Sequence, residues 1–511
     1  MREGQALEAI NVAPDSIWGD EDETIVYAQV LGKGKAIIFR FQRSHDSLSE
    51  SLPSRIVCCY HDLEVSDVEF TFQDRSSMRS ALWSAIATVW PDCIKDPAIA
   101  NPGIVVDILP GEIQEIVGRA YQEPLFDQYL ALLHDTQPSD LVGEGHSPRI
   151  FDISEIVLLE TLGGRGCSKR VQFKDARKPS PLVFKGIDFQ TYLLLHDDDD
   201  EFARTTVDVW RRSTKLVANM PRHPNIQSPP RYLVSVRDSN QNPVLVGHLS
   251  TYFAGGDLGN AIESANARKS QIPLKQKAKW CHQMCLAITH THWVAHTYHM
   301  DIKPGNFVID DQENLIFIDW EQSGAPATTL APEADGTWDV EEQDMNENGS
   351  MKLVYTKYTG PERRNMPEGS GRESFNIWNV FPEWHASCPR AVELAEVFAL
   401  GRTMWMLLSQ TANNFDEVEH PNDVQVNWAG KTDPPSHWVE LVGNCMKVDP
   451  NDRPSLDDLV EFWEGEAYSF KQQASSGFEA ARLNPGRPNR CLCLWNKGLN
   501  AKFRPINELM P

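Results

Sequence analysis

The sequence has no long apolar run and no secretion signal. No stretch approaches the roughly 20 apolar residues that a membrane-spanning helix needs. The first ten residues, MREGQALEAI, are charged and lack the apolar segment of a secretory signal. The ten cysteines do not form the paired C-x-x-C knuckles of a zinc site. We therefore expect an intracellular protein, cytoplasmic or nuclear, with free thiols and no membrane contact.

Basic residues are also scarce. The chain of 511 residues has 48 Lys and Arg against 72 Asp and Glu, which gives a formal net charge of −24. Such a field repels phosphate backbones, so we expect no nucleic-acid partner. It favours a basic protein substrate, although an acidic surface also serves solubility alone. Hydrophobic residues make up 41% of the chain, with 15 Trp, which is enough for sizeable cores in two or three domains.

The first third of the chain predicts an α+β accessory module without a catalytic motif. The pattern at 24–42 is typical of a β-hairpin, and SDVEFTF at 66–72 of a further strand. The stretches at 76–90 and 111–135 have helical periodicity. The predicted boundaries are a flexible N-terminus at 1–20, the accessory module at 21–135, a polar linker at 136–154, a β-rich lobe at 155–254, a helical lobe at 255–465 and a basic tail at 466–511.

The middle of the chain predicts strands first and helices afterwards. Residues 151–173 indicate a strand, a glycine-rich turn and a second strand. Further patterns predict a strand at 181–189, a helix at 201–220 and a strand at 242–253. Beyond Gly255 the pattern becomes mainly helical. We therefore expect a small β-rich lobe and a larger α-helical lobe, with the functional site between them.

The strongest functional signal lies in HMDIKPGNFVID, at 299–310, and IDWEQSG, at 318–324. Asp301 can accept the proton of an attacking hydroxyl, and Lys303 can neutralise a transferring phosphoryl group. Asn306 and Asp319 flank a predicted β-hairpin, which brings their oxygen atoms together as ligands for Mg²⁺. These four residues together predict phosphoryl transfer from a magnesium nucleotide.

Residues upstream predict the phosphate-binding side of the nucleotide site. Gly164 and Gly166, in LGGRGCSKRV, allow backbone amides to lie close over phosphates. Leu162 and Val171 flank this turn and are expected nucleotide contacts. Lys185, at mid-strand in LVFKG, follows the turn and is expected to bind phosphate oxygens. A solvent-facing lysine and an ordinary hairpin are the alternatives.

The stretch HLSTYFAGGDL predicts contacts with the nucleoside. Backbone groups from Thr251 to Phe253 could pair with an adenine edge, and Asp257 could reach the ribose hydroxyls. An ordinary strand and turn is an equal alternative.

These motifs resemble those of the eukaryotic protein kinase superfamily, and the chain from about 155 to 465 looks closest to uncharacterised kinase-domain proteins of filamentous fungi. HMDIKPGN is similar to the catalytic loop H-R-D-x-K-x-x-N, and DWE to D-F-G. GPE at 360–362 is similar to A-P-E, so the resemblance implies that Glu362 pairs with Arg453. EVFALG places Glu396 where an Asp is usual. The resemblance implies a bilobal fold and a serine/threonine protein kinase that uses ATP and Mg²⁺.

Three departures from that pattern bear on activity. Met300 replaces the Arg that reads a phosphorylated activation loop, so we expect activity without that phosphorylation. Glu321 replaces a glycine, which is expected to stiffen the turn after Asp319. The helix acid that should pair with Lys185 is not evident. Ser213 stands at the usual distance, and Asp208 and Glu201 are the nearby alternatives.

Two other functions remain open from the sequence. IDWE is also similar to the metal-ligand motif of aminoglycoside and choline phosphotransferases, which act on small molecules. The expected Glu362–Arg453 pair favours a protein kinase over that class. A nucleotide-binding pseudokinase scaffold is the other alternative, although Lys185 and the four catalytic-loop and metal residues are all retained. Lys303 favours Ser/Thr acceptors, and Thr356 is a candidate for the Thr expected before the Pro-Glu pair.

Overall fold

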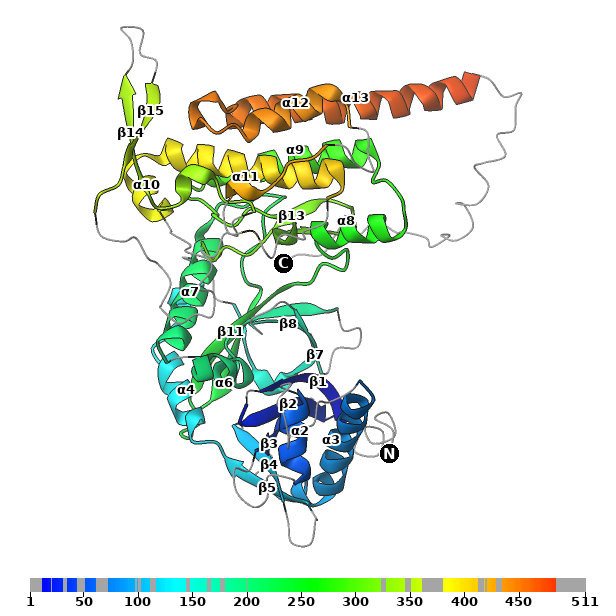
Figure 1. Cartoon of the computed structure of the whole chain (residues 1–511), viewed down its shortest axis with the longest axis vertical. Coiled ribbons are helices and arrows are strands. Elements are labelled where there is room, and N and C mark those ends of the chain that lie inside the picture. Colours follow the sequence, from blue (N-terminus) through cyan, green and yellow to red (C-terminus); the bar gives the residue numbers. More distant parts are fainter. Residues whose placement is uncertain are drawn as a thin grey trace, which may run out of the picture.

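The computed structural model shows an elongated molecule (Figure 1). A five-stranded sheet, a six-stranded sheet and a helical region follow one another along its long axis. The structure describes residues 12–19, 21–30, 35–43, 51–60, 72–96, 99, 103–110, 116–143, 148–162, 167–174, 180–198, 200–322, 328–344, 351–360, 380–411, 418, 421–428 and 434–483.

The accessory module is a sheet with helices on one face. Its strand order is β1-β2-β3-β4-β5, with β3 and β4 parallel and the other pairs antiparallel. Val26, Phe39 and Val106 pack with Trp83 on the helix-covered face. The elements are β1 (Val12–Gly19), β2 (Glu23–Val30), β3 (Lys35–Gln42), α2 (Leu52–Tyr60), α3 (Phe72–Cys93), β4 (Ile104–Pro110) and β5 (Ile116–Gln122).

The structure corrects two expectations in this module. The predicted helix at 111–135 is wrong for 116–122, which form β5 and pair with β4. Side chains of β5 alternate between half-buried and exposed, and Gly118 lets the strand lie against Val89 and Cys93 of α3, where a Cβ would meet atoms at 2.7 Å. The predicted flexible N-terminus contains β1, while residues 1–11 lie outside the described residues, as does nearly all of the strand predicted at 66–72.

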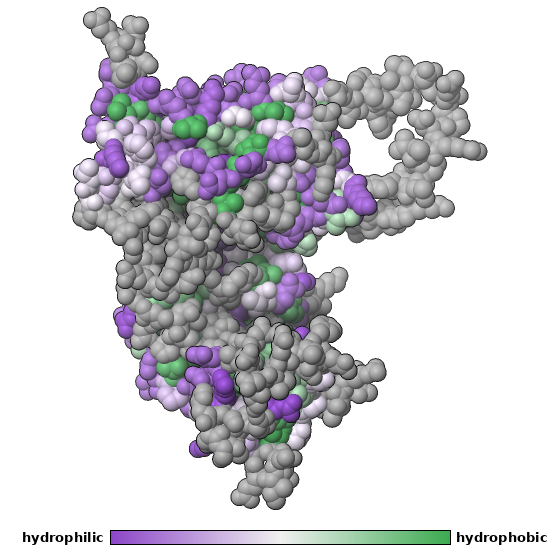
Figure 2. Space-filling view, in the orientation of Figure 1, coloured by the Kyte–Doolittle hydropathy of each residue, from purple (hydrophilic) through white to green (hydrophobic). Residues whose placement is uncertain are grey.

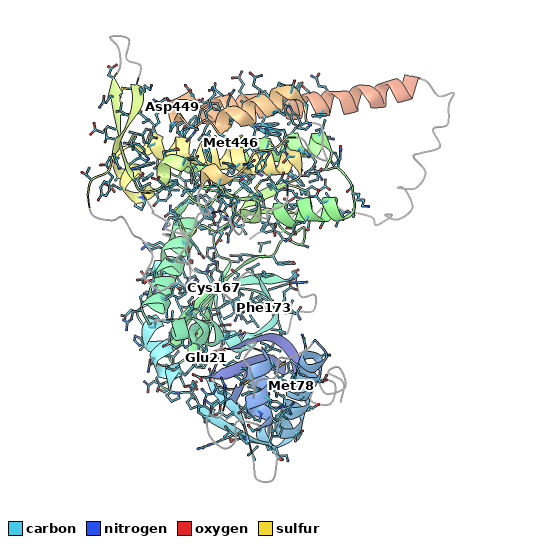
Figure 3. All side chains as sticks on the ribbon, viewed as in Figure 1. Glu21, Met78, Cys167, Phe173, Met446 and Asp449 are labelled. Atoms are coloured by element: carbon cyan, nitrogen blue, oxygen red, sulfur yellow. The ribbon has the colours of Figure 1, made fainter. Side chains whose placement is uncertain are left out.

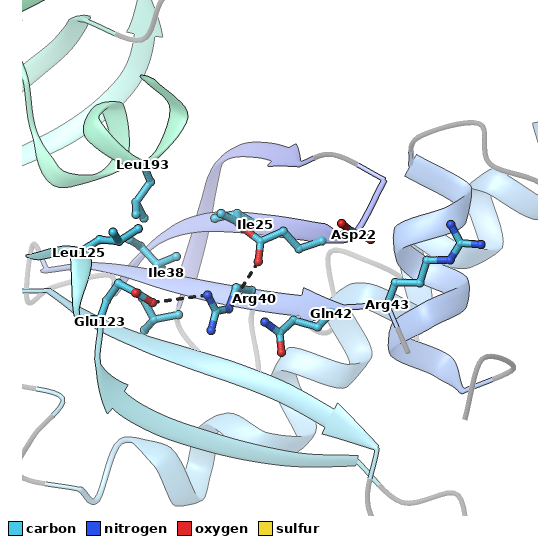
Figure 4. A pocket seen from close by; sticks show the side chains of 11 residues that line it. Asp22, Ile25, Ile38, Arg40, Gln42, Arg43, Glu123, Leu125 and Leu193 are labelled. Atoms are coloured by element: carbon cyan, nitrogen blue, oxygen red, sulfur yellow. Dashed lines mark hydrogen bonds and ion pairs between the residues drawn. The ribbon is translucent and has the colours of Figure 1, made fainter. Parts of the chain in front are cut away.

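The opposite face of this sheet packs on the second sheet's helices. Ile25, Ile38 and Val105 form a cluster with Leu193 of α6 (Phe189–Asp198), because alternate residues of a strand point to opposite faces. Beside this cluster lies a cavity of about 550 Å³ (Figure 4). At its polar side Arg40 forms ion pairs, which involve Glu23, Asp107 and Glu123.

The predicted linker packs against the neighbouring sheet and helices. After α4 (Leu125–Leu133), α5 (Pro138–Leu141) ends in a fully buried Leu141. Leu141 lies in the same hydrophobic cluster as Trp210 of α7 (Asp200–Asn219). The two short helices therefore run across the outside of the second sheet and its helices.

The second sheet has the order β6-β10-β11-β9-β8-β7, in which β6 is parallel to β10 and the other pairs are antiparallel. Cys167 and Phe173 mark the two ends of β8 (Figure 3). The strands predicted around the glycine-rich turn and at 181–189, and the helix at 201–220, are confirmed. The strands are β6 (Ile150–Asp152), β7 (Ile156–Leu162), β8 (Ser168–Phe173), β9 (Leu182–Gly186), β10 (Tyr232–Arg237) and β11 (Pro243–Thr251).

The rest of the described chain is mainly helical and is built around α11, which is buried along nearly its whole length. Three tryptophans, Trp405, Trp438 and Trp463, lie in its main core. The elements are α8 (Leu258–Ala267), α9 (Leu274–Trp293), β12 (Phe307–Ile309), β13 (Leu315–Phe317), β14 (Trp338–Asp344), β15 (Met351–Lys357), α10 (Phe381–Ser387), α11 (Pro389–Ser409), α12 (Ser436–Cys445) and α13 (Leu456–Leu483).

Hydrophilic residues cover much of the visible described surface of this helical region, with scattered apolar patches between them (Figure 2). Within the described part of the chain, no helix has both the length and the apolar character to cross a membrane. In residues 150–483 the six-stranded sheet precedes the mainly helical region, so the expected mixed α+β fold is what the structure contains.

Candidate active site

The loop between α9 and β12 holds Asp301, Lys303 and Asn306 in one hydrogen-bonded group. Asn306 Nδ2 donates to Asp301 O at 2.7 Å and to Asp301 Oδ2 at 2.9 Å. Lys303 Nζ lies 2.7 Å from the same Oδ2. Asp301 is 6% exposed, and among the described residues its Oδ1 has no hydrogen-bond partner. One carboxylate oxygen is thus fixed by the loop, and the other is buried without a hydrogen-bond partner among the described residues.

The surroundings of Asp301 make its carboxylate more basic than usual. Burial raises the pKa of Asp301 above its ordinary value, and the Lys303 ammonium opposes this shift only in part. A carboxylate with a raised pKa and one unpaired oxygen is suited to accept a hydrogen bond or a proton from a hydroxyl.

Glu396 of α11 anchors this loop through hydrogen bonds to its backbone. Its Oε1 accepts hydrogen bonds from His299 N at 2.7 Å and from Met300 N at 2.6 Å. Its Oε2 lies 2.7 Å from His292 Nε2. Burial alone would raise the pKa of Glu396, but hydrogen bonds from His292 and the Met300 amide hold it below its ordinary value. The buried Glu396 therefore stays ionised and fixes Met300, whose backbone has the uncommon φ of 74°.

Asp319 follows β13 and is joined to the same loop. The predicted hairpin is confirmed as β12–β13, in which Phe307 pairs with Phe317, and Ile318 N donates to Asn306 O at 3.0 Å. His299 Nε2 lies 2.8 Å from Ile318 O, and its ring stacks on Phe317 with centroids 3.9 Å apart. Burial lowers the pKa of His299, so its neutral form bonds to this carbonyl.

Lys185 connects this group to the six-stranded sheet. Its Nζ forms an ion pair with Asp319 and lies 3.0 Å from Glu321 Oε1. Burial alone would lower the pKa of Lys185, but these carboxylates raise it above its ordinary value. For Asp319 the signs are reversed: burial alone would raise its pKa, but the Lys185 ammonium holds the pKa below its ordinary value. Five of the predicted residues therefore lie together: Lys185, Asp301, Lys303, Asn306 and Asp319.

The predicted contacts near the glycine-rich turn are divided between two faces of the sheet. Lys185 pairs with Ser168, which pairs with Leu162, so Leu162 lies on the Lys185 face. Val171 pairs with Leu182, is 2% exposed and packs in the core on the other face. Gly164 and Gly166 lie outside the described residues.

Arg170 is a residue of this region that the sequence reasoning missed. It pairs with Val183, on the Lys185 face, and its guanidinium lies 4.7 Å from the ring centre of Tyr252. Tyr252 stands between the predicted adenine contacts Thr251 and Phe253. The glycine-rich pattern pointed to Val171 instead, because pattern matching does not reveal the strand register.

Asp257 is engaged in local structure. It caps α8, with Oδ1 accepting a hydrogen bond from Asn260 N at 2.8 Å, and Oδ2 bonds to the Asn260 side chain. Gly255 lies so close to β12 that a Cβ would be 2.5 Å from Ile309 O, which explains one glycine of the turn. Thr251 is exposed at the end of β11.

The structure corrects the expected partner of Arg453. Its Nη1 lies 2.5 Å from Glu333 Oε1 and its Nη2 lies 2.9 Å from Glu333 Oε2, with both side chains buried. The pairing with Glu362 is therefore wrong, because the guanidinium fork is already occupied; Glu362 itself lies outside the described residues. The letters A-P-E stand at 331–333, and sequence reasoning overlooked them.

With Glu333 in place of Glu362 as the acid partner of Arg453, the segment from Asp319 to that acid is shorter than the resemblance implied. It ends at Glu333, and the hairpin β14–β15 follows it. Thr356, the candidate for the Thr expected before the Pro-Glu pair, lies within β15 and pairs with Asp339.

Of the residues predicted on α7 as partners of Lys185, the two with described side chains, Asp208 and Ser213, make other contacts. Asp208 is 63% exposed and pairs with Arg211. Ser213 donates to the carbonyl of Trp210 at 3.1 Å. The side chain of Glu201 lies outside the described residues.

Comparison with known proteins shows a distant similarity to a protein kinase. No family model matches the chain. The chain is 25% identical over 244 residues to the serine/threonine-protein kinase CHK1 of Saccharomyces cerevisiae, which is 48% of this chain and 40% of that protein. The chain thus spans about two fifths of this relative's length. The similarity indicates a distant protein kinase relationship for about half the chain, and the mixed α+β structure is compatible with it.

Proposed function

We propose that the protein is a serine/threonine protein kinase that transfers the γ-phosphoryl group of Mg-ATP to a protein hydroxyl. The observation that carries this proposal is the convergence of Lys185, Asp301, Lys303, Asn306 and Asp319, which ion pairs and hydrogen bonds join across two parts of the fold. In this proposal the six-stranded sheet and the helical region are the two lobes of a protein-kinase-like fold.

The residues present fit a magnesium nucleotide. Asn306 uses its Nδ2 on Asp301, which leaves its Oδ1 for a cation, and Asp319 offers a carboxylate kept ionised by Lys185. Amide and carboxylate oxygens are the ligands that Mg²⁺ prefers. When bound at Asn306 and Asp319, Mg²⁺ would supply charge neutralisation for the nucleotide phosphates.

The chain's own groups then have separate tasks. Lys185 binds phosphate oxygens, and Lys303 stabilises negative charge beside Asp301. Asp301 orients the acceptor hydroxyl and accepts its proton at Oδ1, the oxygen without a partner among the described residues. Positioning and charge stabilisation supply most of the rate in such transfers.

The Glu333–Arg453 pair supports a protein acceptor. A pair between Arg453 and a Glu is what distinguishes the protein kinase pattern from that of the small-molecule phosphotransferases. That pair exists with Glu333 as its acid. A basic acceptor is the first choice because the chain has a net charge of −24.

The test is a panel of acceptors offered with radiolabelled ATP and Mg²⁺. Basic Ser/Thr peptides and the protein itself are compared with aminoglycosides and choline. Label on Ser or Thr supports the proposal, and label only on a small molecule supports the phosphotransferase alternative. Thermal stabilisation by Mg-ATP without transfer to any acceptor supports the pseudokinase scaffold; at 100 times its Kd a ligand adds about 2.7 kcal/mol.

A further inference from the structure

Lys185 has two carboxylate partners, and both come from the turn after β13. Its side chain is 17% exposed and lies between Asp319 and Glu321. In the proposed reaction the carboxylate of Asp319 serves as a cation ligand. The acid that remains for Lys185 alone is then Glu321, whose Oε1 lies 3.0 Å from Nζ.

Helix α7 offers Lys185 no acid among its described side chains. The buried Thr214 donates to Trp210 O at 2.6 Å. His248, which pairs with Lys185 across the sheet, receives Trp210 Nε1 at 3.4 Å. Burial and the nearby Lys185 lower the pKa of His248 to about 3, so it is neutral. The residue that lies beside Lys185 and contacts α7, through Trp210 and Thr214, is therefore the neutral His248.

Helix α7 also contacts the chain around α4 and α5. Arg211 Nε donates to Thr136 Oγ1 at 2.7 Å, and Arg211 Nη2 donates to Leu132 O at 3.2 Å. A Cβ on Gly143 would lie 2.7 Å from Ala218 O, so the chain after α5 runs directly against α7. These contacts fix the position of α7, and the acid of this helix whose side chain is described, Asp208, pairs with Arg211 and not with Lys185.

The turn that carries Glu321 is held by the catalytic loop. The left-handed backbone positions of this turn are Asp319, with a φ of 69°, and Gln322, with a φ of 55°. Glu321 itself needs no left-handed backbone. Gln322 Nε2 donates to Tyr298 O at 2.7 Å and to Thr297 Oγ1 at 3.1 Å. Trp320, buried to 1% exposure, packs against His299. Glu321 is therefore presented to Lys185 from a turn fixed on both sides.

We propose that Glu321 is the positioning residue for Lys185, in place of an acid on α7. This inference rests on the proposed phosphotransfer. Lys185 is then oriented by the same turn that carries Asp319, and its placement does not depend on movement of α7.

The test is a double-mutant cycle on Glu321 and Lys185. Glu321→Gln keeps the size of the side chain and removes its charge. We expect kcat/KM for ATP to fall about 10- to 100-fold, the range for a lost hydrogen bond to a charged group. Glu321→Asp should recover part of the loss, while Asp208→Asn, a matched change at an exposed acid of α7, should leave the kinetics unchanged.

Nucleotide affinity supplies the second readout, because Lys185→Met is expected to stop turnover. Glu321→Gln should weaken Mg-ATP binding in the wild-type background and have no further effect in Lys185→Met. Equal effects in both backgrounds, or wild-type kinetics for Glu321→Gln, would overturn the inference. The proposed function fails separately if wild type transfers no phosphate, and the binding cycle still tests Glu321 in that case.

Discussion

The buried pair of Glu333 and Arg453 gives a sharp prediction about stability. Arg453 is fully buried at its side chain and Glu333 is 9% exposed there. Two further backbone carbonyls, of Leu394 and Lys447, accept hydrogen bonds from the same guanidinium. Glu333→Gln leaves that charge without its carboxylate. Removal of one partner of a buried pair costs about 3–5 kcal/mol.

That cost is a large share of the roughly 5–15 kcal/mol that stabilise a typical domain. We expect the melting temperature of the unit that contains α11 to fall by roughly 6–20 °C. Urea unfolding followed by Trp fluorescence measures the loss of free energy directly, since Trp405 lies in the core around α11. Replacing both partners, with Glu333→Leu and Arg453→Met, should cost less than the single change, because no unpaired charge remains.

Glu362→Gln is the matched control, because the sequence alone favoured Glu362 as the partner of Arg453. It should leave the unfolding curve unchanged. A loss for Glu362→Gln equal to that of Glu333→Gln would refute the reasoning, and so would an unaltered Glu333→Gln protein.

Three other predictions follow from the site and its supports. Glu396→Gln should lower kcat by about tenfold or more and change KM less, because the His299 and Met300 amides lose a charged acceptor. Steady-state kinetics at a temperature below the Tm of both proteins checks this. His248 has a lowered pKa, so below about 6.5 the unfolded chain binds a proton that the folded chain does not, and stability falls as pH drops towards about 3. Between pH 6 and 5, urea titration should show His248→Asn losing about 1 kcal/mol less than wild type, and parallel losses would contradict the assignment. Leu193→Ala should destabilise the contact with the accessory sheet by about 2–3 kcal/mol and speed limited proteolysis there, whereas the exposed Leu159→Ala should not.

Local patterns predicted much of the fold and of the central site. The spacing within 299–319 placed a loop, a short hairpin and a second acid in order, and the structure brings Asp301, Asn306 and Asp319 together. Such spacing is readable because the hairpin β12–β13 is local and its strands have only a few residues each.

Contacts between distant segments could not be read in the same way. The side of the sheet on which Val171 lies depends on the β8–β9 register, which is set by packing on both faces. The carboxylate partners of Lys185 are Asp319 and Glu321, 134 and 136 positions away, and pairing with α7 was expected only by resemblance. Residues 116–122 have a mixed pattern, and pairing with β4 decides in favour of a strand.

The central claim is that Asp301 supports phosphoryl transfer at the site shared with Lys185 and Asp319. The most direct measurement is the initial rate of transfer from radiolabelled ATP to a basic Ser/Thr peptide by wild type and Asp301→Asn, with Mg-ATP affinity measured for both. We expect a rate at least about a hundredfold lower in the variant, with nucleotide affinity nearly unchanged. Equal rates in the two proteins would contradict the role of Asp301.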